Sequence, residues 1–459
     1  MSAHSKTSGA SENLLTRANP LLSSPIISTL LRLAFPNMLA MLATALATIA
    51  ETAYVASLGT AALAAMAFVF PMVMLQAMLS AGAMGGGVSS AVSRAFGAGK
   101  PNYANDLSAH AMWIGVAAGT LFMMLMIGFA PVIFSALGGQ GEVLALAVTY
   151  ANTAFFGSIF IWLVNTFSSV IRGSGNMRVP SIVLVLVSVL QVLVAGALGL
   201  GWGPFPQLGM AGIAAGQVVA NGLGAAYLML YLLSGKARVQ LRPRQTKLQW
   251  PIARDILRVG AVACLSPFQT VITILILTRL VAYFGTDALA GYGIGTRLEF
   301  LLVPIAFAVG VASVPMVGMA IGAGNVARAR QAAWVAAALA AALLGTIGLI
   351  VTFDPGLWTL RFTQQPAVVE SAALYFLWAG PAYALFGVGL SLYFSSLGAG
   401  KATGPVLAGT LRMAVVAIGG AVLAWLKTPP WTIFALVSLG MAAYGLATIY
   451  AVRVTAWGR

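Results

Sequence analysis

The sequence predicts an all-α polytopic membrane protein, with twelve transmembrane helices in two six-helix lobes related by a pseudo-two-fold axis along the membrane normal. Composition, charge distribution and an internal repeat support this fold class. Hydrophobic residues make up 60% of the 459 residues and charged residues only 7%, whereas soluble domains carry about 25% charged residues. Apolar runs of about 20 residues recur along the chain, and each is long enough to cross a bilayer as a helix.

The predicted spans follow one another along almost the whole chain. In order they are 27–56, 61–93, 107–136, 143–171, 179–203, 209–234, 252–284, 288–319, 327–353, 367–397, 404–426 and 431–452. The first 26 residues are polar and Ser-rich, and they lack the apolar region and cleavage site of a signal peptide. We expect residues 1–26 to form a disordered cytosolic tail and the first span to act as an uncleaved insertion signal.

The basic residues lie in alternate connections between the spans. They are Arg94 and Lys100; Arg172 and Arg178; Lys236, Arg238, Arg242, Arg244 and Lys247; Arg328 and Arg330; and Lys401. The intervening connections hold little beyond Arg361 and Lys427. This positive-inside pattern predicts a multi-pass protein of the plasma (inner) membrane with both termini in the cytoplasm. The net charge of +15 therefore orients the chain, and we expect no nucleic-acid partner.

Three pairs of short motifs reveal an internal repeat. FGAGK (96–100) corresponds to IGAGN (321–325), and IRGSGNMRVP (171–180) to LGAGKATGP (397–405), both at an offset of 225. SLGTAALAA (57–65) corresponds to YFGTDALAG (283–291) at an offset of 226. The repeat predicts an N-terminal six-helix lobe at 27–234 and a C-terminal six-helix lobe at 251–459, joined by a basic cytoplasmic linker at 235–250.

The repeat also indicates a class of function. Six is an even number of spans, so both lobes insert with the same orientation, as in alternating-access transporters built from parallel repeats. The sequence has no His/Cys cluster, no Ser–His–Asp set, no phosphate-binding GxxxxGK[ST] and no redox motif. We therefore expect no enzyme activity, no cofactor and no metal site. The lone Cys264 cannot form an internal disulfide, and transport without a nucleotide site must use an ion gradient.

The order and spacing of these motifs resemble the multidrug and toxic compound extrusion (MATE) transporters over about residues 28–452. LRLAFP (31–36) opens the first span, an acid late in that span precedes SLGTAALAA, and the paired glycine turns follow. The major-facilitator motif GxxxDRxGRR is absent, since the chain reads SRAFGAGKPN there. The resemblance is strongest to the proton-coupled bacterial branch called DinF-like, whose first span carries a proline and then an acid. Pro36 and Glu51 stand at those positions, about 22 Å apart along a helix.

Glu51 is the main candidate for cation coupling. It is one of nine acids in the chain and the only charge in TALATIAETAYVASLG (44–59). A carboxylate at the centre of a span costs about 2.5–3.5 kcal/mol, so this position must compensate for the charge or use it. A low-dielectric environment disfavours the charged form of a carboxyl group, which suits reversible proton binding. The alternative is a structural acid held by Thr44, Thr48 or Thr52.

The same resemblance places polar residues opposite the acid in the first lobe. Asn165 matches the asparagine of span 4, and Gln217 falls where a threonine is expected in span 6. The acid and the asparagine expected in span 5 are missing, and Ser188 and Gln191 are the nearest polar groups. Asn165, Gln191, Gln217 and Asn221 are the candidates for the substrate cavity in this lobe. Each could equally be an interhelical hydrogen-bonding residue, and Pro36 a tolerated kink rather than a moving part.

The second lobe has a different set of polar residues. Gln269 occupies the place of an acid found in the sodium-driven branch, and span 10 has no acid after Glu370. This favours protons over sodium and leaves Gln269 as a further cavity candidate. Arg297 and Glu299 lie two apart on span 8 and should point in different directions. Arg412 lies inside span 11, where we expect it to line the cavity or pair with Glu299.

The sequence thus predicts a secondary antiporter that exports amphipathic, often cationic organic compounds in exchange for protons, with sodium as the less favoured ion. Its partners would be small organic substrates, protons and membrane lipid, and we expect a monomer. One alternative is a flippase for a lipid-linked saccharide precursor, which would need several cations along its cavity; only Arg279, Arg297 and Arg412 are available. Another is a channel with the acid lining its pore.

Overall fold

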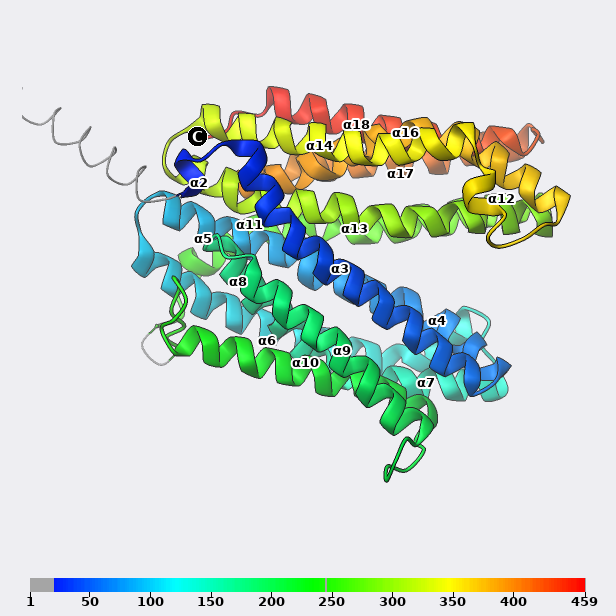
Figure 1. The fold of residues 1–459 in the computed structure, drawn as a ribbon, viewed down its shortest axis with the longest axis horizontal. Coiled ribbons are helices and arrows are strands. Elements are labelled where there is room, and N and C mark those ends of the chain that lie inside the picture. Colours follow the sequence, from blue (N-terminus) through cyan, green and yellow to red (C-terminus); the bar gives the residue numbers. More distant parts are fainter. Residues whose placement is uncertain (1–19, 244–245, 459) are drawn as a thin grey trace, which may run out of the picture. The chain divides into compact units, whose positions relative to one another are not determined.

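The computed structural model describes residues 20–243 and 246–458, and its regular elements there are all helical (Figure 1). Most of the predicted N-terminal tail, and Arg244 of the linker, lie outside these residues. The helices of the first half are α2 (Pro20–Ser23), α3 (Ile26–Ser57), α4 (Thr60–Ala77), the π-helix η1 (Met78–Met84), α5 (Gly85–Gly97), α6 (Pro101–Ala136), α7 (Gly141–Phe156), α8 (Ser158–Gly173), α9 (Arg178–Leu200) and α10 (Gly209–Leu233).

The second half repeats this plan with one short extra helix. Its helices are α11 (Trp250–Ala263), α12 (Leu265–Ala282), α13 (Thr286–Gly322), α14 (Val326–Phe353), α15 (Gly356–Thr359), α16 (Pro366–Gly398), α17 (Thr403–Trp425) and α18 (Trp431–Val454). Within the described residues, 11 helical segments are long and apolar enough to cross a membrane, or 12 if the bent pair α7–α8 is one span. These coincide with the twelve predicted spans, so the predicted all-helical membrane fold is confirmed.

Three of the spans are interrupted, which the sequence analysis did not anticipate. In the second span η1 separates α4 from α5, and in the seventh Cys264 separates α11 from α12. The fourth span bends by 45° between α7 and α8, at Gly157. A Cβ atom at Gly157 would lie 2.6 Å from Val218 Cγ2, so only glycine allows α10 to approach the bend this closely. Breaks of this kind are tolerated in a membrane where neighbouring helices or side chains satisfy the freed backbone groups.

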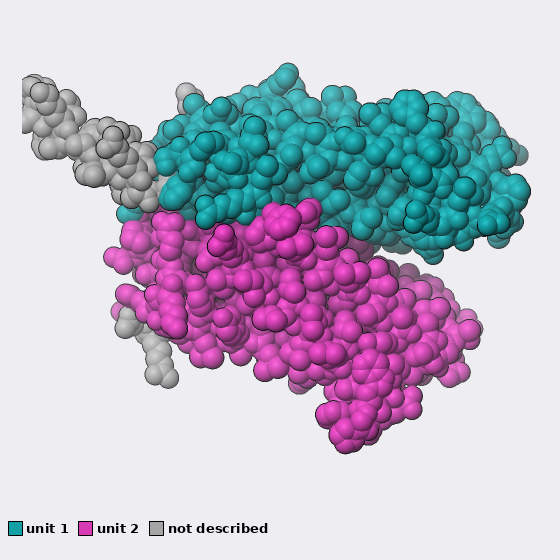
Figure 2. All heavy atoms as spheres, in the orientation of Figure 1, with its two compact units in different colours: residues 1–34, 97–99, 261–459 teal, residues 35–96, 100–260 magenta. Residues whose placement is uncertain are grey.

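The chain divides into two compact units (Figure 2). Unit 1 comprises residues 1–34, 97–99 and 261–459, and unit 2 comprises residues 35–96 and 100–260. The first residues of α3 thus belong to unit 1 and most of α11 to unit 2. The changes of unit after Ala34 and after Gly260 lie 226 residues apart, which is the offset of the SLGTAALAA repeat. The predicted lobe boundaries at 234 and 251 stay a prediction.

Unit 1 is densely packed where α14 crosses α16. Thr352 on α14 donates from Oγ1 to the carbonyl oxygen of Gly348 (2.7 Å) and to that of Phe376 on α16 (3.1 Å). A Cβ atom at Gly348 would lie 3.0 Å from the carbonyl carbon of Gly380 and 3.1 Å from Cδ2 of Tyr383. The backbones of the two helices are therefore in direct contact, and small-residue contacts of this kind are typical of membrane helix pairs.

We expect Gly348→Ala to lower the free energy of unfolding by about 1–3 kcal/mol, because the added methyl group meets backbone that cannot move aside. Gly293→Ala on α13 is the matched control, since a Cβ atom at Gly293 meets nothing within 4 Å. Thermal unfolding of the two purified variants in the same detergent provides the comparison. Equal melting temperatures for both variants and the wild type would contradict the close helix contact.

Two arginines of unit 1 hold the ends of other helices. Arg328 donates from Nη2 to the carbonyl oxygens of Leu21 (3.1 Å) and Ser24 (2.5 Å), at the C-terminal end of α2. Arg330 donates from Nη2 to the carbonyl oxygen of Thr455 (2.9 Å), just after α18. Cations are favourable at helix C-termini, where carbonyl groups lack partners within the helix. Arg328 and Arg330, which the charge pattern explains by the orientation of the chain in the membrane, therefore also have a structural role.

In unit 2 the inter-lobe linker runs along the start of α6. The backbone N–H of Gln240 donates to Asn105 Oδ1 (2.8 Å), and that of Gln249 donates to Nε2 of His110 (2.8 Å). The other ring nitrogen of His110 bonds the carbonyl oxygen of Asp106 at 2.8 Å. Because Nε2 accepts a backbone N–H, this buried imidazole is neutral. The linker is therefore attached to α6 on both sides of residues 244–245.

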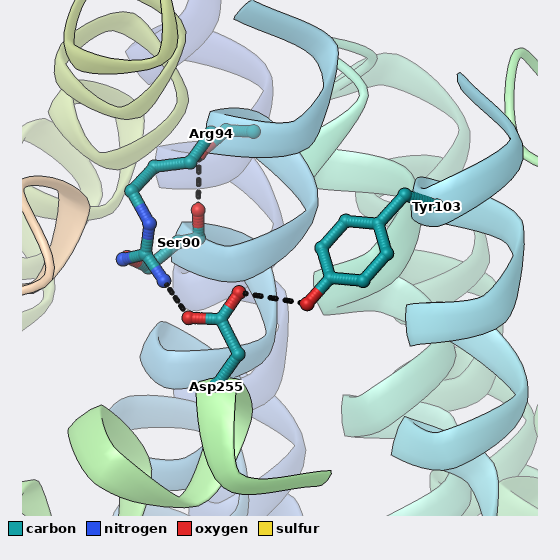
Figure 3. A network of polar contacts seen from close by, with 5 residues as sticks. Ser90, Arg94, Tyr103 and Asp255 are labelled. Atoms are coloured by element: carbon teal, nitrogen blue, oxygen red, sulfur yellow. Dashed lines mark hydrogen bonds and ion pairs between the residues drawn. The ribbon is translucent and has the colours of Figure 1, made fainter. Parts of the chain in front are cut away.

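An ion pair follows where the linker enters α11 (Figure 3). Arg94 on α5 donates from Nη2 to Asp255 Oδ1 (2.6 Å) and from Nη1 to Ser90 Oγ (2.6 Å). Tyr103 on α6 donates its hydroxyl to Asp255 Oδ2 (3.4 Å). The carboxylate of Asp255 therefore joins α5, α6 and α11 within unit 2, and it holds the first half of the seventh span against the second and third.

Candidate cation-coupling site

Glu51 is buried in unit 2, with 4% of its surface exposed. Its Oε1 accepts a hydrogen bond from Nε2 of Gln191 on α9 (2.8 Å). Two turns earlier, the hydroxyl oxygens of Thr44 on α3 and Ser188 on α9 lie 3.4 Å apart. The facing pairs 44/188 and 51/191 show that α3 and α9 run in parallel here, so the acid of the first span meets the polar side chains of the fifth.

The threonines around Glu51 bond to their own helix. Thr44, Thr48 and Thr52 donate to the carbonyl oxygens of Ala40 (3.0 Å), Thr44 (3.0 Å) and Thr48 (2.8 Å), each four residues earlier. None of these bonds reaches the carboxyl group of Glu51. A structural acid held by threonine would require such a bond. Within unit 2 the hydrogen-bond partner of Glu51 is Gln191, one of the residues that the sequence analysis named.

Two tyrosines lie within electrostatic range of Glu51. They are Tyr54, one turn later on α3, and the fully buried Tyr150 on α7. The sequence analysis missed both, because tyrosine in an apolar helix is usually a packing residue. The position of Tyr54, three residues after the acid on the same helix face, was the available signal.

The other predicted residues of the first lobe do not contact Glu51 through any hydrogen bond of the described structure. Asn165 on α8 donates from Nδ2 to Ser80 Oγ in η1 (2.8 Å). Asn221 donates to the carbonyl oxygen of Gln217, within α10 (2.8 Å), and the buried Gln217 Oε1 has no hydrogen-bond partner. Asn165 therefore contacts the π-helix of span 2, and π-turns inside α-helices occur often at functional sites.

Pro36 lies inside α3, two residues after the change of unit at Ala34. The next residue, Asn37, is completely buried, and neither its Oδ1 nor its Nδ2 has a hydrogen-bond partner. The sequence analysis did not single out Asn37. The available signal was the position of this amide, directly after a proline in an otherwise apolar run.

The second-lobe charges are arranged separately within unit 1. Glu299 on α13 accepts a hydrogen bond from the hydroxyl of Tyr375 on α16. Arg412 lies over the ring of Phe386 (5.3 Å to the centroid), and Arg297 over that of Phe362 (5.3 Å). Among the described residues the one ion pair within 4.0 Å is Arg94–Asp255, so Arg412 and Glu299 do not pair directly. Each is instead satisfied by an aromatic partner, although Arg412 acts electrostatically on Glu299.

Gln269 on α12 also has a partner inside unit 1. It donates from Nε2 to Thr410 Oγ1 on α17 (2.8 Å), while its Oε1 has none. Among the described residues, no three His, Cys, Asp or Glu side chains group closely enough to hold a metal ion. The polar chemistry of this fold thus comes from single buried acids with neutral hydrogen-bonding partners.

The fold and these buried acids can now be compared with known proteins. The MatE family model matches residues 36–196 and 263–426. The chain belongs to the MatE family. It is therefore a multi-pass transporter of a family that does not carry out enzymatic catalysis, and the family resemblance seen in the sequence is confirmed.

Curated relatives of this MatE chain cover most of it. The FAD transporter of Shewanella oneidensis is 27% identical over 373 residues, which are 80% of this chain and 81% of that protein. The probable multidrug resistance protein NorM of Thermotoga maritima is 27% identical over 304 residues, 65% of this chain and 64% of that protein. The matches thus include multidrug exporters and a transporter of a dinucleotide.

Solved structures show the same fold. A MOP superfamily transporter from Pyrococcus furiosus superposes with a TM-score of 0.86 at 21% identity, covering 95% of this chain and 97% of that one. The Vibrio cholerae MATE transporter VcmN in its bent form gives a TM-score of 0.84 at 21% identity, covering 93% and 97%. At these identities the likeness establishes the fold alone.

Proposed function

We propose that this MatE protein is a secondary antiporter that exports amphipathic organic compounds in exchange for protons, by alternating access. The observation that carries the proposal is the buried carboxyl group of Glu51, bonded to the neutral amide of Gln191 across α3 and α9. A buried acid without a cationic partner is suited to carry a proton, because protonation removes the charge that the membrane disfavours.

Gln191 suits both forms of such a carrier. Its Nε2–H donates to Oε1 of Glu51 at 2.8 Å, and this bond suits the charged form of the carboxyl group. After protonation the carboxyl group has an O–H to donate, and a rotated amide offers Oε1 as the acceptor. The site therefore needs no second acid. A cationic substrate bound near the carboxylate would compete with the proton for the same negative charge, and this competition is sufficient for exchange.

The remaining parts of the proposal follow from the same chemistry. Protons are favoured over sodium because the amides of Gln191 and Gln269 each offer one oxygen, whereas metal cations are bound by several oxygen ligands. We assign the chain to the DinF-like branch through Pro36 and Glu51. Asn165, Gln217, Asn221 and Gln269 are proposed to contact substrate, and we propose a monomer of the inner membrane with both termini in the cytoplasm.

The names of the relatives widen the range of substrates to test. Several are multidrug export proteins, and one is a transporter of FAD, an anionic dinucleotide. We propose that the substrate class is amphipathic compounds with a planar or apolar body. A cationic dye and FAD are the two informative probes, since they differ in charge.

Reconstituted proteoliposomes provide the test. We expect an imposed pH gradient to drive uptake of a cationic dye such as ethidium, with saturation at high dye concentration. A sodium gradient at equal pH on both sides should leave the uptake near the level of empty vesicles. Uptake driven by sodium but not by the pH gradient would overturn the choice of ion. Uptake that never saturates would favour a channel, and a lack of transport of both dye and FAD would contradict an exporter of soluble compounds.

A further inference from the structure

Arg172 is the largest completely enclosed side chain of unit 2. It lies in the last turn of α8, and 2% of its surface is exposed. Among the described residues no acid lies within ion-pairing distance of Arg172; Asp255 pairs with Arg94, and Glu51 bonds to Gln191. Arginine does not lose its proton in proteins, so this is a buried positive charge without a counter-ion in the part of the chain that the structure describes.

The unpartnered atoms of Arg172 lie on one edge of its guanidinium group. They are Nε and Nη2. The N–H groups of these two nitrogens point in the same direction, and this edge binds a carboxylate or a phosphate through two parallel hydrogen bonds. The charge-pattern analysis treated Arg172 as a loop cation facing the cytoplasm. Its burial shows that orientation alone does not explain it.

Unpartnered hydroxyl groups are found on α8 itself and on the neighbouring α5. Ser168 precedes Arg172 by one helical turn, so both lie on the same face of α8, and its buried Oγ has no partner. Ser89 on α5 also has an unpartnered buried Oγ, and it lies beside α8: a Cβ atom at Gly173 would be 2.8 Å from the carbonyl oxygen of Ser89. All of these groups are hydrogen-bond donors.

The carbonyl groups at the end of α8 are already engaged. Ile171 O accepts from Ser174 Oγ (2.7 Å) and from Asn176 N (3.3 Å), and Arg172 O accepts from Gly175 N (2.9 Å). Ser174 O accepts from Nη1 of a second arginine, Arg238 (3.2 Å). These carbonyl groups accept from donors other than Nε and Nη2 of Arg172, which have no partner.

From these unpartnered buried donors we infer that Arg172, with Ser168 and Ser89, forms a binding site for an oxyanion where α5 packs beside the end of α8 in unit 2. An oxyanion offers acceptors only, and two of its oxygens match the free guanidinium edge. A phosphate group fits, either from a soluble phosphate compound or from the headgroup of an anionic phospholipid. This inference goes beyond the proposed antiport and does not depend on Glu51.

Binding measurements on the full-length protein test the site. The probes are inorganic phosphate added to protein in a neutral detergent with chloride as the other anion, and nanodiscs of phosphatidylglycerol compared with phosphatidylcholine. We expect phosphate or phosphatidylglycerol to raise the melting temperature of the wild type, and the effective probe identifies the source of the group. Arg172→Gln should weaken this binding about tenfold or more. Arg178→Gln, an exposed arginine at the start of α9, should bind as the wild type does.

A second readout separates a site from a structural role. Without phosphate and anionic lipid, Arg172→Gln should melt at the same temperature as the wild type or higher, because the variant lacks an unpaired buried charge. A lower melting temperature, or failure to fold, would mean that the guanidinium is satisfied within the protein and would overturn the site. The site would also be overturned if no probe stabilised the wild type or Arg178→Gln. Equal stabilisation of Arg172→Gln and the wild type would overturn it too.

Discussion

Glu51→Gln should abolish pH-driven export while leaving expression and membrane insertion normal. Glutamine keeps the shape of the side chain and can still bond to Gln191, which donates to Glu51 at 2.8 Å in the wild type, but it cannot bind and release a proton. Proteoliposomes with an imposed pH gradient should show dye uptake at the level of empty vesicles, and the rate should no longer depend on pH.

Two variants of the same helix serve as controls. Glu51→Asp should retain part of the activity, because it keeps the titrating group and shortens its reach by one methylene. Thr48→Val should transport as the wild type does, because the Thr48 hydroxyl is exposed and bonds only to the carbonyl oxygen of Thr44 (3.0 Å). Wild-type transport by Glu51→Gln at pH 7 would remove Glu51 from the mechanism.

The arrangement of spans could be predicted because hydrophobic length and alternating charge survive in the linear sequence. A run such as 179–203 is apolar whichever neighbours it finds, so its helix, α9 (Arg178–Leu200), was predictable. The interruptions at η1, Gly157 and Cys264 were not, because hydropathy is the same for a straight and a bent span. The interruptions depend on which helix packs against the span, as α10 packs against Gly157 through Val218.

Of the candidate site, the acid Glu51 was predictable from the sequence, whereas its hydrogen-bond partner was less so. A lone acid in an apolar run is expensive, and this drew attention to Glu51 without any structure. That Gln191 rather than Ser188 bonds to it depends on the register of α3 against α9, 140 residues away. The unpartnered edge of Arg172 was beyond the sequence, since the positive-inside pattern accounts for an arginine at that position with or without burial.

A second, half-buried acid makes the location of coupling a question that experiment can answer. Glu299 on α13 accepts from Tyr375 and interacts electrostatically with Arg412, so it too could carry a proton. The first lobe is favoured because Glu51 has a neutral amide as its partner, whereas the charge of Glu299 is balanced by a nearby cation. We therefore propose that Glu51 carries the proton and that Glu299 stabilises the lobe.

This difference predicts opposite behaviour for variants of the two acids. Glu299→Leu should lower the free energy of unfolding by about 1–3 kcal/mol, because it leaves the buried hydroxyl of Tyr375 without an acceptor. Glu299→Gln, which keeps an acceptor for Tyr375, should be less damaging and should transport with the wild-type dependence on pH. Thermal unfolding and pH profiles of dye uptake give the two readouts.

Gln269→Ala is the comparison inside the same lobe. It removes one neutral interhelical hydrogen bond, to Thr410 (2.8 Å), which is worth about 1 kcal/mol of stability in a membrane. Its pH profile should match the wild type, and sodium should affect none of the variants. A flat pH profile for Glu299→Gln together with a normal one for Glu51→Gln would place proton coupling in the second lobe. Sodium-stimulated transport that survives Glu51→Gln and is lost in Gln269→Ala would place a sodium site there instead.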